Sequence, residues 1–214
     1  MANTHPSDEL IELYANGSLS EGMDTFVKGH LHYCPACRNK VELLEAVAGE
    51  LLSEGGSQAK LKCLTVENVF KKAAEQELKE IKNLTPDIVG GVMPNMFNNL
   101  IGKTSEQIQW RFRLPGIYDF KISENDGEEI SLLKAEPGAK IFQHTHDGEE
   151  ATLVLSGALQ DGNKVLQAGD VSVVDETHTH NPSIIGNEPC ICLIVMSGKV
   201  KFTGRFTRAF NLLN

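Results

Sequence analysis

The chain has 214 residues, 41% of them hydrophobic, and a formal net charge of −9, which is the composition of an ordinary globular protein. Residues 1–85 and 86–214 each carry more acidic than basic side chains, so neither half has the positive charge expected of a DNA-binding surface. The longest apolar run has seven residues, whereas a helix needs about 20 to span a bilayer. The amino terminus lacks the pattern of a secretory signal, so we expect a cytoplasmic protein that binds neither nucleic acid nor membrane directly.

The number and spacing of the cysteines indicate what they do. There are five, an odd number, and four of them form two close pairs. In a reducing compartment this pattern argues against a disulfide framework and favours metal ligands or reactive thiols. The two pairs are Cys34 with Cys37 and Cys190 with Cys192.

The first 85 residues have the apolar spacing of short helices. Ser7 and Ser20 are suitable N-caps, and Pro35 suits the first turn of a third helix. Such a unit is too thin to bury all of its apolar stripes alone. The predicted helices, in chain order, cover residues 7–16, 20–32, about 35–51 and, after a flexible break at 54–58, residues 66–81.

After Pro86 the pattern changes to short alternating runs separated by Gly and Pro turns, which is typical of an all-β barrel or sandwich of jelly-roll size. The expected fold class is therefore α+β in two domains, a small all-α domain of residues 1–85 and an all-β domain of residues 86–214. The boundary falls between residues 81 and 96. The clearest predicted strands are Ile130–Ala135, Ala151–Leu155, Asp170–Val174 and Cys190–Met196.

A first metal site is predicted in the helical part. His30 precedes Cys34 by one helical turn, and Cys37 follows in a C-x-x-C spacing. These are ligands that Zn²⁺ prefers, and His5 is available as the fourth, with His32 as its competitor. A thioredoxin-like redox dithiol is the alternative, but that motif follows a strand, and helical patterns lie on both sides here.

This arrangement resembles the zinc-binding anti-sigma factors, which hold an extracytoplasmic-function sigma factor inactive. Positions His5, His30, Cys34 and Cys37 match the motif of that family residue by residue. The resemblance implies a 1:1 complex in which the helices clasp the sigma factor and cover its surfaces for core RNA polymerase. The alternative is a stand-alone structural zinc module.

A second metal site is predicted in the β part. Residues 138–157 fit the pattern G-x5-H-x-H-x3-E-x6-G at every fixed position. His144 and His146 point to the same face of a strand, and a turn brings Glu150 beside them on the returning strand. Histidines packed in a barrel core without metal are the alternative, but they would leave buried polar groups unpaired.

A fourth ligand is expected from residues 169–184, which resemble the second cupin motif, G-x5-P-x-G-x2-H-x3-N. The sequence departs from it, with Asp175 for Pro, Thr177 for Gly and Ile184 for Asn. Motif spacing selects His180, whereas strand alternation alone does not separate it from His178. Three histidines and a carboxylate accept zinc, iron, manganese or nickel, and we favour zinc as the second divalent metal.

Cys190 and Cys192 flank one residue of a strand and so share a face. Such positions lie nearly 7 Å apart along a strand, at the limit of disulfide reach. Two interpretations stay open, small core residues and a redox thiol pair.

The combination of both motifs in one chain resembles the ChrR family of anti-sigma factors, and this likeness covers nearly the whole sequence. It implies inhibition of an extracytoplasmic-function sigma factor and its release during singlet-oxygen or oxidative stress, with the cupin domain needed for the response. It also implies a role for the pair Cys190 and Cys192. We therefore expect a regulator and not an enzyme. The alternative is a cupin metal-dependent dioxygenase or isomerase with an accessory zinc domain, which metal identity and turnover would distinguish.

Overall fold

The computed structural model describes residues 2–53 and 107–204 and begins with three helices. Two start at the predicted caps, because the hydroxyl of Ser7 accepts the N–H of Leu10 and that of Ser20 accepts the N–H of Met23. The predicted fourth helix and the predicted domain boundary lie outside the described residues. The helices are α1 (Asp8–Ala15), α2 (Glu21–Tyr33) and α3 (Pro35–Ser53).

Eleven strands follow in residues 107–204, and the four predicted strands are among them, with ends shifted by one or two residues. Every pairing between them is antiparallel. The strands are β1 (Arg111–Leu114), β2 (Ile117–Asn125), β3 (Glu128–Ala135), β4 (His144–His146), β5 (Glu150–Ser156), β6 (Ala158–Asp161), β7 (Lys164–Gln167), β8 (Val171–Val174), β9 (Ser183–Ile185), β10 (Cys190–Ser197) and β11 (Val200–Phe202).

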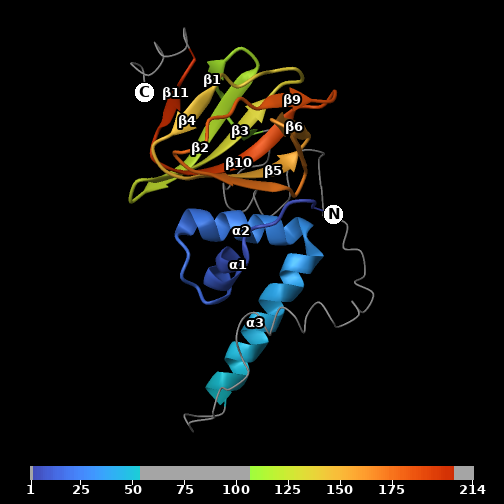
Figure 1. Ribbon diagram of the computed structural model, residues 1–214, viewed down its shortest axis with the longest axis vertical. Helices are drawn as coiled ribbons and strands as arrows, with labels where there is room; N and C mark the ends of the chain where they lie inside the picture. The colour runs from blue at the N-terminus through green and yellow to red at the C-terminus, as the bar shows by residue number, and fades with distance from the viewer. Residues whose placement is uncertain (1, 54–106, 205–214) are drawn as a thin grey trace.

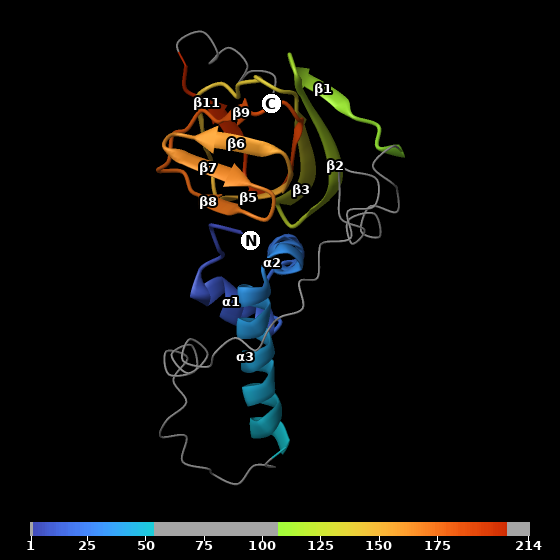
Figure 2. The same ribbon diagram turned by 90° about the vertical axis from the view of Figure 1, so that its right-hand side faces the viewer.

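The strands form a large sheet, in the order β1-β2-β3-β10-β5-β8, and two small ones, β7-β6-β9 and β11-β4. Figure 2 shows β6 and β7 on the opposite side of the β domain from β2 and β3. Strands of the large sheet and of the β7-β6-β9 sheet contribute to one apolar cluster that lies between these two sheets. It includes Val154 from β5 and Leu159 from β6. The expected fold class is confirmed as a small helical domain followed by a β-sandwich.

The middle strands of the large sheet are buried on both faces. Along β5, Val154 points into the sandwich, whereas Leu153 and Leu155 point out and pack in one cluster with Phe26 of α2. Figure 1 shows α2 lying across the outer face of this sheet. Burial on two sides explains why β5 and β10 read as nearly continuous apolar runs instead of alternating ones. The apolar stripes of the helices are thus covered in part by the β domain.

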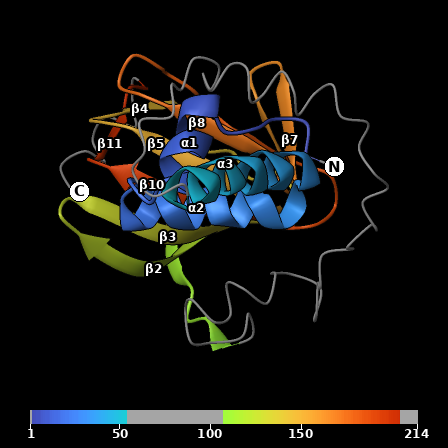
Figure 3. The ribbon, with the colours of Figure 1, turned by 90° about the horizontal axis from the view of Figure 1, so that it is seen from below.

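A carboxylate of the β domain holds the first turn of α2. Glu128 of β3 accepts the hydroxyl hydrogen of Ser20 at 2.7 Å and the N–H of Gly22 at 2.8 Å. A negative charge at a helix N-terminus interacts favourably with the helix dipole and satisfies an amide that has no partner inside the helix. Seen from below, α2 runs beside β3 and β10 (Figure 3), so this contact fixes one end of the helix on the sheet.

The far end of α3 extends away from the other described helices and strands (Figure 1). Val41 in its first half is buried, but Leu51 is 40% exposed and Leu52 is 83% exposed. Among the helices of the described residues, none is long and apolar enough to cross a membrane. The end of α3 thus carries two exposed apolar side chains, whereas its first half packs in the core.

Gly22 tests the contact between the helices and the sheet. A Cβ atom at this position would lie 2.6 Å from a methyl carbon of Val195, so Gly22→Ala should push α2 away from the sheet. We expect a loss of about 1–3 kcal/mol in the free energy of unfolding, measured by urea denaturation of the full chain. Gly49→Ala in α3 is the matched control, because a Cβ there meets nothing within 4 Å. The control should be neutral or stabilising, and an equal loss in both variants would contradict the contact.

Candidate metal centres

The first candidate centre forms where α2 ends and α3 begins. His30 lies in the last turn of α2, and Cys34 is the C-cap residue, with the extended backbone that a following proline favours. Pro35 starts α3, and Cys37 follows within its first turn. This short connection brings the side chains of His30, Cys34 and Cys37 to one point.

All four predicted ligands of this centre come together. One ligand atom from each of His5, His30, Cys34 and Cys37 lies within 4.8 Å of every other. The Nδ1 atom of His5 is 3.4 Å from the sulfur of Cys34 and 3.5 Å from that of Cys37. His5 is exposed, whereas the other three are buried. The competitor His32 is not in this group and instead packs its ring edge-on against Tyr33.

The hydrogen bonds of His30 prepare it to bind a metal. Its Nδ1–H donates to the carbonyl of Gly169 at 2.8 Å, which leaves the lone pair on Nε2. That Nε2 atom is buried and has no hydrogen-bond partner in the structure. A buried nitrogen without a partner is costly unless a cation or proton donor satisfies it. Two thiols and two imidazoles around such an atom are the donor set that Zn²⁺ prefers.

The two sulfurs of this centre influence each other. A hydrogen bond from the thiol of Cys37 lowers the pKa of Cys34, and the neighbouring imidazole of His30 adds to this effect. The same hydrogen bond and burial raise the pKa of Cys37. Cys34 therefore carries the first thiolate, which is the form of cysteine that binds metal.

The second candidate centre lies in the β domain at β4, which carries His144 and His146. The backbones of His144 and His180 form two mutual N–H to carbonyl hydrogen bonds of 3.0 Å, so this isolated bridge places His180 opposite His144. One nitrogen from each of the three histidines lies within 4.8 Å of the others. The structure thus brings together three of the four predicted ligands.

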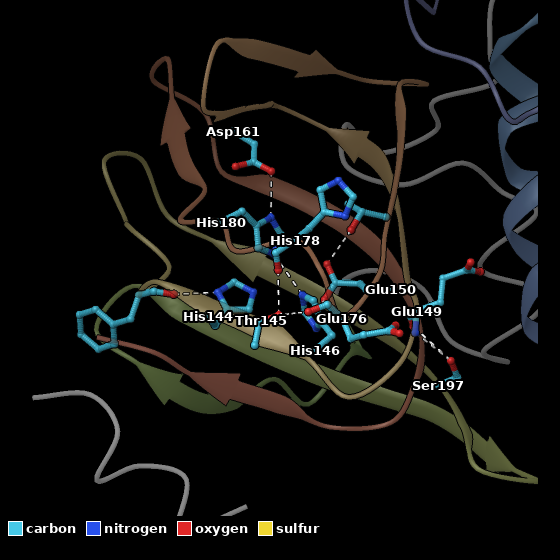
Figure 4. Close-up of polar contacts among 12 residues, drawn as sticks. His144, Thr145, His146, Glu149, Glu150, Asp161, Glu176, His178, His180 and Ser197 are labelled. Carbon is cyan, nitrogen blue, oxygen red and sulfur yellow. Dashed lines mark hydrogen bonds and ion pairs between the residues drawn. The ribbon is translucent and has the colours of Figure 1, made fainter. Parts of the chain in front are cut away.

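Outer hydrogen bonds orient two of these imidazoles, as Figure 4 shows. The Nδ1–H of His144 donates to the carbonyl of Phe142 at 2.7 Å, and that of His180 donates to the carboxylate of Asp161 at 2.8 Å. Both rings therefore keep a free lone pair on Nε2. The Nε2 atoms of His180 and His146 are only 3.1 Å apart. Such convergence of imidazole nitrogens favours a shared cation.

Glu150 stands just outside this group. One carboxylate oxygen is 3.5 Å from Nδ1 of His146, and the other accepts the hydroxyl hydrogen of Thr152 at 3.0 Å. The turn after β4 therefore brings Glu150 beside the histidines as predicted, but in contact with His146 and not within the cluster of ligand atoms.

Burial and charge set the protonation of the three histidines. Burial lowers the pKa of His144 and of His146 to about 4, so both are neutral near pH 7 and able to donate a lone pair. Burial also acts to lower the pKa of His180, but the hydrogen bond and the charge of Asp161 outweigh it and raise that pKa.

The structure separates His178 from His180. Asp175 and Thr177 form a turn, so His178 is not on a strand and the alternation that left the two histidines equivalent does not apply. The ring of His178 is exposed and contacts the carboxylate of Asp175 at 2.8 Å. Of the two, it is His180 that reaches His144 and His146.

A cavity of about 640 Å³ opens beside the second centre. His144, Glu150 and His180 line one part of it, and mostly apolar side chains line the rest. Cys192 also lines this cavity, and its sulfur lies 3.7 Å from that of Cys190. The hydrogen bond with Cys190 and burial raise the pKa of the Cys192 thiol, which disfavours its thiolate form.

Three residues that contact these centres were not predicted from the sequence. Asp161 orients His180 from β6, Gly169 orients His30, and Asp170 binds the backbone just before His5. The sequence shows a turn signal at Asp161–Gly162 and the first glycine of the second cupin motif at Gly169, but neither signal names the partner of that residue. These partners depend on strand register and on how the two domains pack, which residue spacing does not contain.

Comparison with known proteins agrees with this architecture. The family model described as ChrR Cupin-like domain matches residues 99–201. The chain is 31% identical over 200 residues to the anti-sigma-E factor ChrR of Cereibacter sphaeroides. The aligned region covers 92% of this chain and 91% of that relative. It also resembles a chain in the crystal structure of Rhodobacter sphaeroides SigE in complex with the anti-sigma ChrR, with a TM-score of 0.70 and 28% identity, over 92% of this chain and 99% of that one. The chain therefore belongs to the ChrR family of anti-sigma factors.

Proposed function

We propose that this protein binds an extracytoplasmic-function sigma factor in the cytoplasm as a 1:1 complex and releases it under oxidative stress. The observation that carries the proposal is the pair of exposed apolar side chains at the end of α3, Leu51 and Leu52, at the opposite end of the helix from the thiolate centre that fixes its start. The relative whose structure it resembles was crystallised with SigE. The acidic charge of the chain suits a basic, nucleic-acid-binding partner.

The two centres have different tasks in this proposal. His5, His30, Cys34 and Cys37 bind a structural Zn²⁺ that fixes α3 relative to α2 and so presents the two exposed leucines. His144, His146 and His180, with Glu150 as the carboxylate partner, bind a second divalent metal in the cupin domain, with zinc favoured. The residues fit a metal in both places because the unpartnered Nε2 of His30 converges with His5 and two sulfurs in the first centre, and three imidazole nitrogens converge in the second.

We place the stress sensor in the cupin domain. A signal releases a partner only if it changes the relative free energies of the bound and free states, so the sensing site must be coupled to the helices. The cavity of about 640 Å³ gives small molecules access to His144 and His180, and Cys192 lines the same cavity. Singlet oxygen or another oxidant could act there on a metal ligand or on the thiol pair.

The same cavity supports a second candidate function, a metal-dependent dioxygenase or isomerase. A metal held by three histidines and a carboxylate keeps open positions if its coordination is octahedral. Membership of an anti-sigma family favours the regulator. An iron content with substrate turnover would favour the enzyme, whereas zinc without turnover would favour the sensor.

We expect two metal ions per chain in the purified full-length protein, measured by elemental analysis. Cys37→Ser should lose one ion because a hydroxyl replaces a thiolate ligand, and His180→Ala should lose the other. His178→Ala is the matched control and should keep both ions, since its ring is exposed and bonded to Asp175. Full metal content in His180→Ala, or a loss in His178→Ala, would show that the ligands have been assigned wrongly.

The apolar end of α3 should dominate sigma-factor binding. Leu51→Asp places a charge in the proposed contact and should weaken binding at least tenfold, or about 1.4 kcal/mol, by titration of the purified partner. Val165→Asp is the control, because Val165 in β7 is 44% exposed and Leu51 is 40% exposed. Equal affinities for the two variants would place the contact elsewhere.

If the second centre is the sensor, substitution of its ligands should impair induction of the sigma factor's target genes under stress without impairing repression in unstressed cells. His144→Ala and Glu150→Gln should leave the sigma factor repressed in unstressed cells, because both residues line the cavity of the β domain, and should blunt induction by singlet oxygen. A reporter gene under the sigma factor measures both. The double variant Cys190→Ser with Cys192→Ser tests the thiol route separately. Normal induction in the metal-ligand variants would exclude the second centre as the sensor.

A further inference from the structure

The turn between β7 and β8, residues 167–171, lies against the thiolate centre of the helical domain. We propose that Gly169 and Asp170 in this turn are positioning residues for the zinc site, so that the β domain sets how tightly the helical domain holds its metal. The inference rests on the proposed zinc ligation by His5, His30, Cys34 and Cys37. It adds a partner to that site which is distant from it in the sequence.

Gly169 contacts the centre through its backbone. Its carbonyl accepts the Nδ1–H of His30, which is a contact between residues 139 positions apart. A Cβ atom on Gly169 would lie 2.6 Å from Cβ of Tyr33, and its φ of +92° also favours glycine. The hydroxyl of Tyr33 in turn donates to the carbonyl of Leu155 on β5 at 2.9 Å. The end of α2 is thus held by two hydrogen bonds, one to the turn and one to β5.

Asp170 holds the segment that delivers His5. Its side chain is fully buried, and its carboxylate accepts the backbone N–H of Asn3, Thr4 and Gln167, the last two at 2.9 and 2.8 Å. The hydroxyl of Thr4 exchanges two 2.7 Å hydrogen bonds with the backbone of Val171. The two residues immediately before His5 are therefore attached to the β domain.

This attachment matters because His5 is the one exposed member of its group. An exposed residue near a chain end must lose conformational freedom before it can bind a metal. Because Asn3 and Thr4 are already held in place when the chain folds, His5 loses less conformational entropy when it binds a metal beside the two sulfurs. Outer partners of metal ligands typically change affinity by about 10–100-fold.

The same turn is bonded to β5, the strand that begins beside the second centre. The N–H of Gly169 donates to the carbonyl of Val154 at 2.8 Å, and the N–H of Val154 donates to the carbonyl of Asp170 at 3.0 Å. Val154 belongs to β5, which begins at Glu150 beside His146. A continuous set of contacts thus joins the two metal centres, and a shift of β5 would reach both His30 and His5.

The test replaces zinc by Co²⁺ in the full chain, because thiolate-to-cobalt and ligand-field absorption report the ligand set of this centre. Asp170→Asn replaces one carboxylate oxygen, which accepts backbone N–H groups of the turn and of the segment before His5, by an amide NH₂ group that cannot accept them. We expect Co²⁺ and Zn²⁺ affinity at the thiolate centre to fall about 10–100-fold, by competition with a chromophoric chelator. The spectrum should shift toward that of His5→Ala, which removes the ligand itself.

One control and one additional test variant separate this inference from the ligand assignment. Asp161→Asn changes a carboxylate that supports the second centre, and it should leave the thiolate spectrum and affinity unchanged. Thr4→Val removes the contact to Val171 without touching Asp170, and serves if Asp170→Asn does not fold. A parent-like spectrum and affinity in Asp170→Asn or Thr4→Val, while His5→Ala is altered, would overturn the positioning role. An unaltered His5→Ala would instead refute His5 as a ligand.

Discussion

The architecture depends on one sheet whose middle strands, β5 and β10, are buried on both of their faces. Leu153 and Leu193 point out from its middle strands and share a core with Phe26 of α2, whereas Val154 and Ile194 point into the sandwich. Burial of apolar surface is the main favourable term in folding, so removing either cover would expose half of this sheet. The helical and β domains are therefore separate in fold class but share one core, and a change in the sheet affects both.

The metal centres follow a common rule on opposite sides of that sheet. His30, His144 and His180 each donate Nδ1–H to a protein oxygen, which leaves the Nε2 lone pair for a metal. For His30 and His180 the oxygen belongs to a residue 139 and 19 positions away in the chain, whereas for His144 it belongs to Phe142, only two residues earlier. The orientation of His30 and His180 therefore depends on tertiary packing, which is a property that a sensor can use, because a change in packing would change the affinity of a site.

Residue spacing was sufficient for part of this structure. Ser7 and Ser20 marked the helix starts, and the H-x-x-x-C-x-x-C and H-x-H spacings marked both centres, because these signals act over one turn of helix or one hairpin. Spacing did not separate His178 from His180, since the Asp175 turn breaks the strand pattern there. It also missed Asp161 and Asp170, which act across 19 and 166 or more residues through contacts set by packing. The expected fourth helix and boundary remain predictions.

Because they share this sheet, the helical domain and the β domain should unfold as one unit. Two probes can follow urea unfolding of the full chain, namely the fluorescence of Trp110, the only tryptophan, which packs at the edge of the shared core, and the absorption of Co²⁺ bound to Cys34 and Cys37. The account predicts that both signals change at the same urea concentration with the same steepness. Two transitions, with the cobalt signal lost while Trp110 stays native, would contradict it.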